Sequence, residues 1–60
     1  MNKIEAVEIL TKYRHRNTCW IIEYGEIIGI VNGHPETVNH HYLTDFEAIA
    51  IAEKYIRDKR

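Results

Sequence analysis

Apolar residues run almost without interruption through the middle of the chain, from Cys19 to Val31. Tyr24-Gly25 divides the run, and Gly25 can take the positive φ that a tight reversal needs. β-Branched and aromatic residues dominate both halves, which predicts two strands joined in a hairpin. Within each half, apolar side chains fall on both faces, and strands of that kind usually lie in a sheet that is covered on both sides.

A weaker alternation follows this hairpin. Asn32-Gly33 predicts a second tight turn, and the following His34-Pro35 favours an edge position for the third strand. Residues 36–42 then alternate loosely between the two faces of a strand. Val38, His40 and Tyr42 share one face, and Thr37, Asn39 and His41 share the other.

Both ends of the chain carry a helical pattern behind a capping box. Asn2 and Glu5 open the first helix, whose apolar residues recur at helical spacing to about Arg14. Thr44 and Glu47 open the last helix in the same way. Its expected buried stripe consists of Ala48, Ile49, Ala52, Tyr55 and Ile56.

These elements predict a single α+β domain over residues 1–60, in the order α-β-β-β-α, with a three-stranded antiparallel sheet packed by two helices. The two-sided apolar character of residues 19–31 favours helices on opposite faces. It equally permits both helices on one face, with the other face buried in a homodimer or against a partner protein. A chain of this length buries only about 60% of its unfolded surface, so a partner would add needed stability.

Charge and composition narrow the class of protein. Eight basic and nine acidic residues give a net charge of −1, so no surplus of positive charge favours nucleic acid. The single Cys19 excludes an internal disulfide and fits a reducing compartment. No apolar run approaches the roughly 18 residues of a membrane span, and no signal-peptide core is present. We therefore expect a cytoplasmic protein that does not engage a membrane.

No group of residues has the spacing of a catalytic or metal site. Cys19 with His34, His40 and His41 is the one conceivable metal set. The adjacent His40 and His41 point to opposite faces of a strand, so the set cannot converge on one zinc ion. Cys19 itself is expected to be a small core residue rather than a nucleophile. We expect no catalytic residue, no metal and no cofactor, and hence no enzyme.

The order of elements resembles that of the double-stranded-RNA-binding domain, which has nearly this length. Residues 44–56 are similar to the last helix of that family, which grips phosphates with a basic cluster at the start of this helix. Residues 44–47 here are Thr-Asp-Phe-Glu, so the basic cluster that binds phosphate is missing. This departure from the family's pattern argues against RNA binding. Residues 40–42 with residues 14–16 could still form a mixed aromatic and basic surface, which keeps a small nucleic-acid-binding regulatory protein as the alternative.

The chain also resembles small orphan proteins of phages and prophages in which helices sandwich a short antiparallel sheet. This resemblance rests on Trp20 in the first strand and on the Tyr-x-Thr-Asp entry to an alanine-rich last helix, namely Tyr42, Thr44, Asp45, Ala48, Ala50 and Ala52. It implies a non-enzymatic protein-binding module, a phage or mobile-element inhibitor or modifier of a host protein such as a defence factor. The candidate contact residues are Tyr24, His40, His41 and Tyr42, chosen for expected exposure and because Tyr is enriched at interface hot spots.

Overall fold

The computed structural model of the chain describes residues 1–32 and 38–58. Its elements are α1 (Lys3–Lys12), a short 3₁₀ turn η1 (His15–Asn17), β1 (Cys19–Glu23), β2 (Glu26–Asn32), β3 (Val38–Leu43) and α2 (Asp45–Asp58). The strands form one antiparallel sheet in the order β1-β2-β3. The predicted α+β class and α-β-β-β-α order are therefore confirmed, whereas Gly33, His34 and Pro35 lie outside the described residues.

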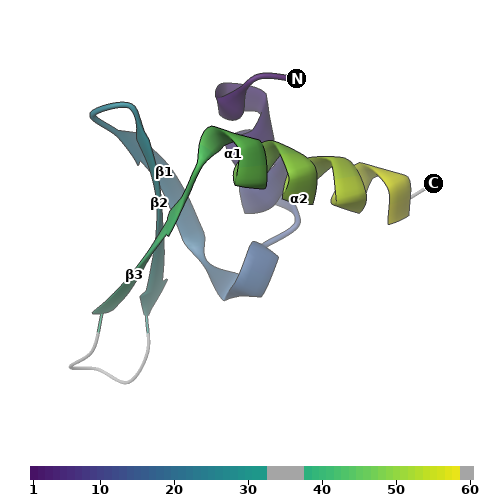
Figure 1. Cartoon of the computed structure of the whole chain (residues 1–60). Helices are drawn as coiled ribbons and strands as arrows, with labels where there is room; N and C mark the ends of the chain where they lie inside the picture. The colour runs from purple at the N-terminus through teal and green to yellow at the C-terminus, as the bar shows by residue number, and fades with distance from the viewer. Residues whose placement is uncertain (33–37, 59–60) are drawn as a thin grey trace.

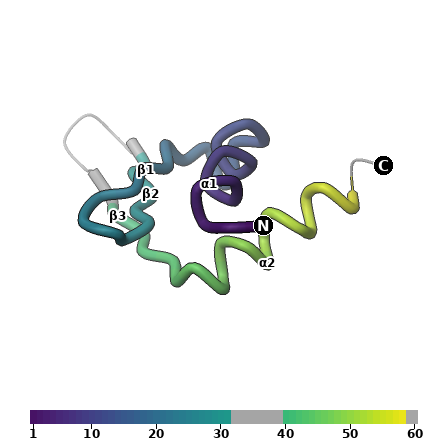
Figure 2. The backbone as a smooth tube through the Cα atoms, turned by 90° about the horizontal axis from the view of Figure 1, so that it is seen from above, coloured from purple at the N-terminus to yellow at the C-terminus, as the bar shows by residue number. Residues whose placement is uncertain are grey.

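Both helices lie on the same face of the sheet (Figure 1), and the view from above shows them side by side next to it (Figure 2). The prediction that the helices lie on opposite faces of the sheet is therefore wrong. The reason is that each helix buries only a narrow stripe, and α2 contacts α1 more extensively than it contacts β3. The two helices together cover one sheet face, and neither is left for the other face.

The hydrophobic core lies between the helix pair and the covered face of the sheet. The sheet contributes Trp20 and Ile27, α1 contributes Ala6, Val7 and Leu10, and α2 contributes Ala48 and Ala52. Ala48 and Ala52 stand one helical turn apart and are fully buried, so their small side chains let the helices approach closely. Ala50 is exposed, so only two of the three alanines serve this packing.

Trp20 lies across the middle strand, where Gly29 is its partner in the register. A Cβ at Gly29 would lie 2.7 and 2.8 Å from Cζ3 and Cη2 of Trp20, and 2.6 Å from Cγ2 of Thr18. Those separations are shorter than carbon atoms tolerate, so the missing side chain of Gly29 is what makes room for the indole.

The two helix starts follow the capping boxes predicted from the sequence. Asn2 Oδ1 accepts from the backbone N–H of Glu5 at 2.9 Å, and the backbone N–H of Asn2 donates to the Glu5 carboxylate at 3.5 Å. At α2, the backbone N–H of Glu47 donates to Thr44 Oγ1 at 3.1 Å, and the Thr44 N–H donates to the Glu47 carboxylate at 3.2 Å. Each box satisfies backbone donors that a helix start leaves without a partner.

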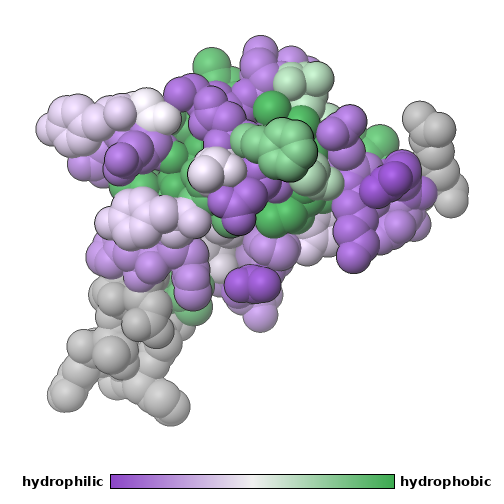
Figure 3. Space-filling model, viewed as in Figure 1, coloured by the Kyte–Doolittle hydropathy of each residue, from purple (hydrophilic) through white to green (hydrophobic). Residues whose placement is uncertain are grey.

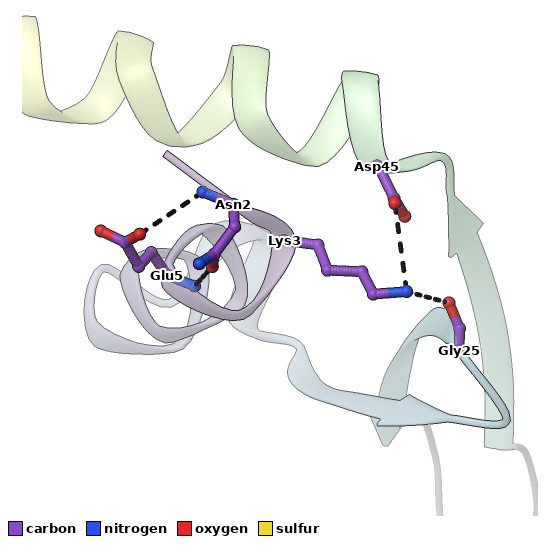
Figure 4. A network of polar contacts seen from close by, with 5 residues as sticks. All are labelled: Asn2, Lys3, Glu5, Gly25 and Asp45. Atoms are coloured by element: carbon purple, nitrogen blue, oxygen red, sulfur yellow. Dashed lines mark hydrogen bonds and ion pairs between the residues drawn. The ribbon is translucent and has the colours of Figure 1, made fainter.

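Lys3 connects three parts of the fold (Figure 4). Its Nζ donates to the carbonyl oxygen of Gly25 in the β1–β2 turn at 2.9 Å and lies 4.0 Å from Oδ2 of Asp45 at the start of α2. Tyr24 and Gly25 both have positive φ, at 52° and 77°, as a two-residue type I′ hairpin requires. The tip of the hairpin is thus held against the beginning of both helices.

Replacing Thr44 with alanine should lower the free energy of unfolding by about 1 kcal/mol, because the N–H of Glu47 loses its acceptor. Urea unfolding followed by far-UV circular dichroism measures the change. The matched control is Thr11→Ala in the last turn of α1, where the threonine side chain is exposed. Alanine is the better helix former there, so Thr11→Ala should leave stability unchanged or slightly higher. Equal losses in both variants would contradict the assigned cap.

Candidate interaction surface

One face of the sheet points away from both helices, and we call it the open face. The strand register arranges its side chains in rows. Glu23 and Glu26 form the row at the hairpin end, Ile21, Ile28 and Tyr42 form the central row, and Cys19, Ile30 and His40 form the third row. These positions alternate along the strands with Trp20 and Ile27, which belong to the core on the other side.

Burial differs sharply between the two faces of the same strands. Ile27 is 1% exposed beneath the helices, whereas Tyr42 on the open face is 64% exposed. Ile21, Ile28 and Ile30 are half-buried. None of the described elements lies over them (Figures 1 and 2). The open face is therefore an apolar surface with polar residues at its ends.

The four contact residues predicted from the sequence are all exposed, with Tyr24 at 96%. They do not form one surface. His40 and Tyr42 lie on the open face, Tyr24 lies at the tip of the first hairpin, and His41 lies beside Gly29 on the helix side of the sheet. The structure therefore brings together two of the four. The sequence analysis allowed for an apolar sheet face that the helices leave free, but its candidate contact residues did not include the isoleucines of that face.

Cys19 is exposed, so the prediction that it is a core residue is wrong. It stands in the row of Ile30 on the open face, where the helices do not reach. Among residues 1–32 and 38–58, no three side chains of the kinds that bind metals gather in one place. His34, a member of the conceivable metal set, lies outside this part of the chain. The same residues contain no helix long and apolar enough to cross a lipid bilayer.

Exposed apolar side chains also occur on the helix side of the molecule. Phe46 in the first turn of α2 is 82% exposed, and Met1 and Ile4 are exposed near the start of α1. Figure 3 shows hydrophobic residues at the surface over the beginning of α2, separated by polar side chains from the sheet. These residues offer matched control positions for tests of the open face.

A second surface feature is a cleft of about 250 Å³ between η1, β3 and α2. Its lining includes His15, Arg16, Thr18, Trp20, His41, Tyr42 and Glu47. The cleft thus joins two basic and aromatic segments that lie far apart in the sequence. The indole N–H of Trp20 is buried beside it and has no hydrogen-bond partner among the described residues. Arg14, Arg16 and Asn17 all have left-handed backbone, a conformation that favours glycine.

The fold alters the titration of His15. Its Nδ1 lies 2.7 Å from the hydroxyl oxygen of Tyr55, and its ring stacks on Trp20 with centroids 5.9 Å apart. Burial lowers the pKa of His15 below its ordinary value of 6.5, and the positive charge of Arg16 lowers it further. The neutral imidazole is therefore the form that the native state prefers.

The free energy of unfolding should fall as the pH is lowered through about 6.5, because the unfolded state then binds a proton on His15 more readily than the native state does. The contribution of His15 is present above the ordinary pKa and is lost below it. Urea unfolding at pH 7.5 and pH 5.5 measures the change in wild type and in His15→Gln. The variant should lose less stability between these two pH values than the wild type. An equal loss would show that other groups account for the pH dependence.

Comparison of the chain with protein-family models, with curated proteins and with solved structures gives no match. The class that can be stated is the one that the elements define, a small α+β domain with one sheet face covered by two helices.

Proposed function

We propose that the protein is a small non-enzymatic binding module that holds a partner protein on its open face. An apolar row carries the proposal: the exposed Tyr42 and the half-buried Ile28 lie side by side on strands whose other face forms the core, and none of the described elements lies over them. Contiguous apolar surface with polar residues at its edge is typical of interaction sites. Tyr42 adds an exposed tyrosine, a residue type enriched among the side chains that dominate binding energy.

The resemblance to phage and prophage orphan proteins suggests which kind of partner is bound, and we include it in the proposal. The protein would then be a phage or mobile-element product that inhibits or modifies a host protein such as a defence factor, and it would act in the cytoplasm. The small size and the exposed apolar surface are compatible with such a role, and the partner itself has to be found by capture.

The experiment is a pull-down from a bacterial lysate with wild type and two open-face variants, Ile28→Lys and Tyr42→Ala. The wild type should recover one protein in stoichiometric amount, and both variants should lose it. The matched control is Phe46→Ala, which removes an aromatic ring with similar exposure from α2 and should retain the partner. Recovery by all four proteins alike would place binding elsewhere, and recovery by none would count against the proposal.

A small nucleic-acid-binding regulatory protein is the second candidate, favoured by the cleft that joins His15 and Arg16 to His41. Glu47 also lines the cleft, and the chain carries a net charge of −1, so the positive potential there is limited. A gel-shift assay at low salt with single- and double-stranded probes tests this candidate. Binding that weakens with salt and is lost in Arg16→Ala would support it, because phosphate contacts release counterions.

A further inference from the structure

We infer that the occupant of the open face is a second copy of this chain, packed sheet against sheet with the strands of the two copies antiparallel. This inference rests on the proposed function, because both assign a protein to the same surface.

The rows of the open face are self-complementary. The Ile28 row lies midway between the Glu26 row and the Ile30 row, about 7 Å from each. A twofold axis that lies between the two sheets and is perpendicular to their strands would place one central row upon the other. The carboxylates of each copy would then face the row of Cys19, Ile30 and His40 in the other copy. The same patch serves both copies, as closed dimers require.

The charges decide between the two ways of stacking the sheets. Glu23 and Glu26 are direct cross-strand partners, so each copy already holds two like charges side by side. Strands stacked in parallel would bring four carboxylates together at one end. Stacked antiparallel, Glu26 instead lies over Ile30 of the other copy, one strand away from His40, and the crossing angle of about 30° between packed sheets can bring the imidazole N–H of His40 to that carboxylate. The antiparallel arrangement is therefore the one that the charges permit.

The size of the patch sets the strength of the contact. The described part of the open face spans three strands and three rows, a footprint of roughly 14 by 14 Å. Stable dimers bury about 800 Å² on each partner, several times this footprint. Association should therefore be weak and reversible, with a dissociation constant in the micromolar range or above.

Sedimentation velocity between about 5 μM and 1 mM tests the inference on the full chain. The mean mass should rise from that of a monomer toward that of a dimer, and the reaction of Cys19 with Ellman's reagent should slow as the dimer forms. His40→Glu should weaken association at least about tenfold, since it would place a third negative charge against the carboxylates of the other copy. The matched control His41→Glu lies on the helix side and should leave association unchanged.

Mixing two charge variants tests the antiparallel arrangement directly. His40→Glu should remain monomeric alone at concentrations where the wild type dimerises. Glu23→Lys/Glu26→Lys should associate more weakly than the wild type, because its lysines cannot accept the N–H of His40. An equimolar mixture should restore the dimer, because lysines of one variant then face the introduced glutamate of the other. Circular dichroism of each variant checks that the fold is intact.

Three results would overturn the inference: a monomer at every concentration, variants that associate as the wild type does, or a double-lysine variant that pairs with wild type better than wild type pairs with itself. The last of these would indicate parallel stacking. If the protein is monomeric but captures a host protein that the Ile28→Lys variant does not capture, the second copy is refuted and the proposed function stands. A protein that neither self-associates nor depends on Ile28 for capture would refute the proposed function as well.

Discussion

Gly29→Ala is expected to lower the free energy of unfolding by about 2–3 kcal/mol. The new methyl group would lie within 2.8 Å of two ring carbons of Trp20 and within 2.6 Å of a Thr18 methyl carbon. The indole is rigid and 6% exposed, so it can move only by disturbing the core around it. Overpacking of this kind typically costs 1–3 kcal/mol. A 60-residue domain has a total stability of roughly 3–9 kcal/mol, so this loss is a large fraction of the total and should lower the melting temperature clearly.

Urea unfolding monitored by Trp20 fluorescence and by circular dichroism measures this loss. Gly25→Ala is the comparison, because the nearest atom to its new Cβ would be 3.7 Å away and only the positive φ opposes it. Its cost should be about 1 kcal/mol. The double variant Thr18→Ser/Gly29→Ala removes one of the colliding methyl groups and should recover part of the stability. A Gly29→Ala protein as stable as wild type would mean that the indole does not lie against β2.

Ile27→Thr should cost about 2–4 kcal/mol, whereas Ile28→Thr should cost less than about 1 kcal/mol in dilute solution. The two residues are neighbours on β2, and both substitutions keep the β-branched side chain that strands favour. Ile27 is 1% exposed in the core, so threonine there removes packing and buries a hydroxyl group. Ile28 faces away from the helices, where the hydroxyl remains in contact with water.

Thermal and urea unfolding at micromolar protein concentration measure both changes, and far-UV circular dichroism checks the fold. Leu43→Ala provides a further comparison, because Leu43 is the cross-strand partner of Ile27 and packs against the same core. It should be destabilising as well, although less than Ile27→Thr, since Leu43 is only partly buried. Equal losses for the two isoleucine variants would mean that the open face is covered within one chain.

The elements of this fold could be predicted because their signals are local. Each helix begins with a capping box whose two members are three residues apart, namely Asn2 with Glu5 and Thr44 with Glu47. Four consecutive residues are therefore enough to predict where each helix begins. The first hairpin turns at Tyr24-Gly25 as predicted, although the positive φ of Tyr24 could not be anticipated from a residue type that rarely adopts it.

The placement of the helices could not be predicted, because it depends on long-range packing. An apolar run such as residues 19–31 indicates that both sheet faces are apolar, but it does not indicate what covers each of them. Whether α2 packs mainly on the sheet or on α1 depends on how Ala48 and Ala52 fit against the other helix. The candidate site could be predicted only in part for the same reason. The sequence predicted that His40 and Tyr42 are exposed, but only the strand register shows that they lie beside Ile30 and Ile28.

The packing of α1 against α2 joins the first helix of the chain to the last. Trp20 and Ile27 lie on strands that pair locally, yet the residues that shield them come from both ends of the sequence. During synthesis, the meander can therefore form when only α1 is present to cover its core side. The native state becomes reachable only after α2 has been translated, and until then the chain exposes the open face together with the part of the core that α2 covers.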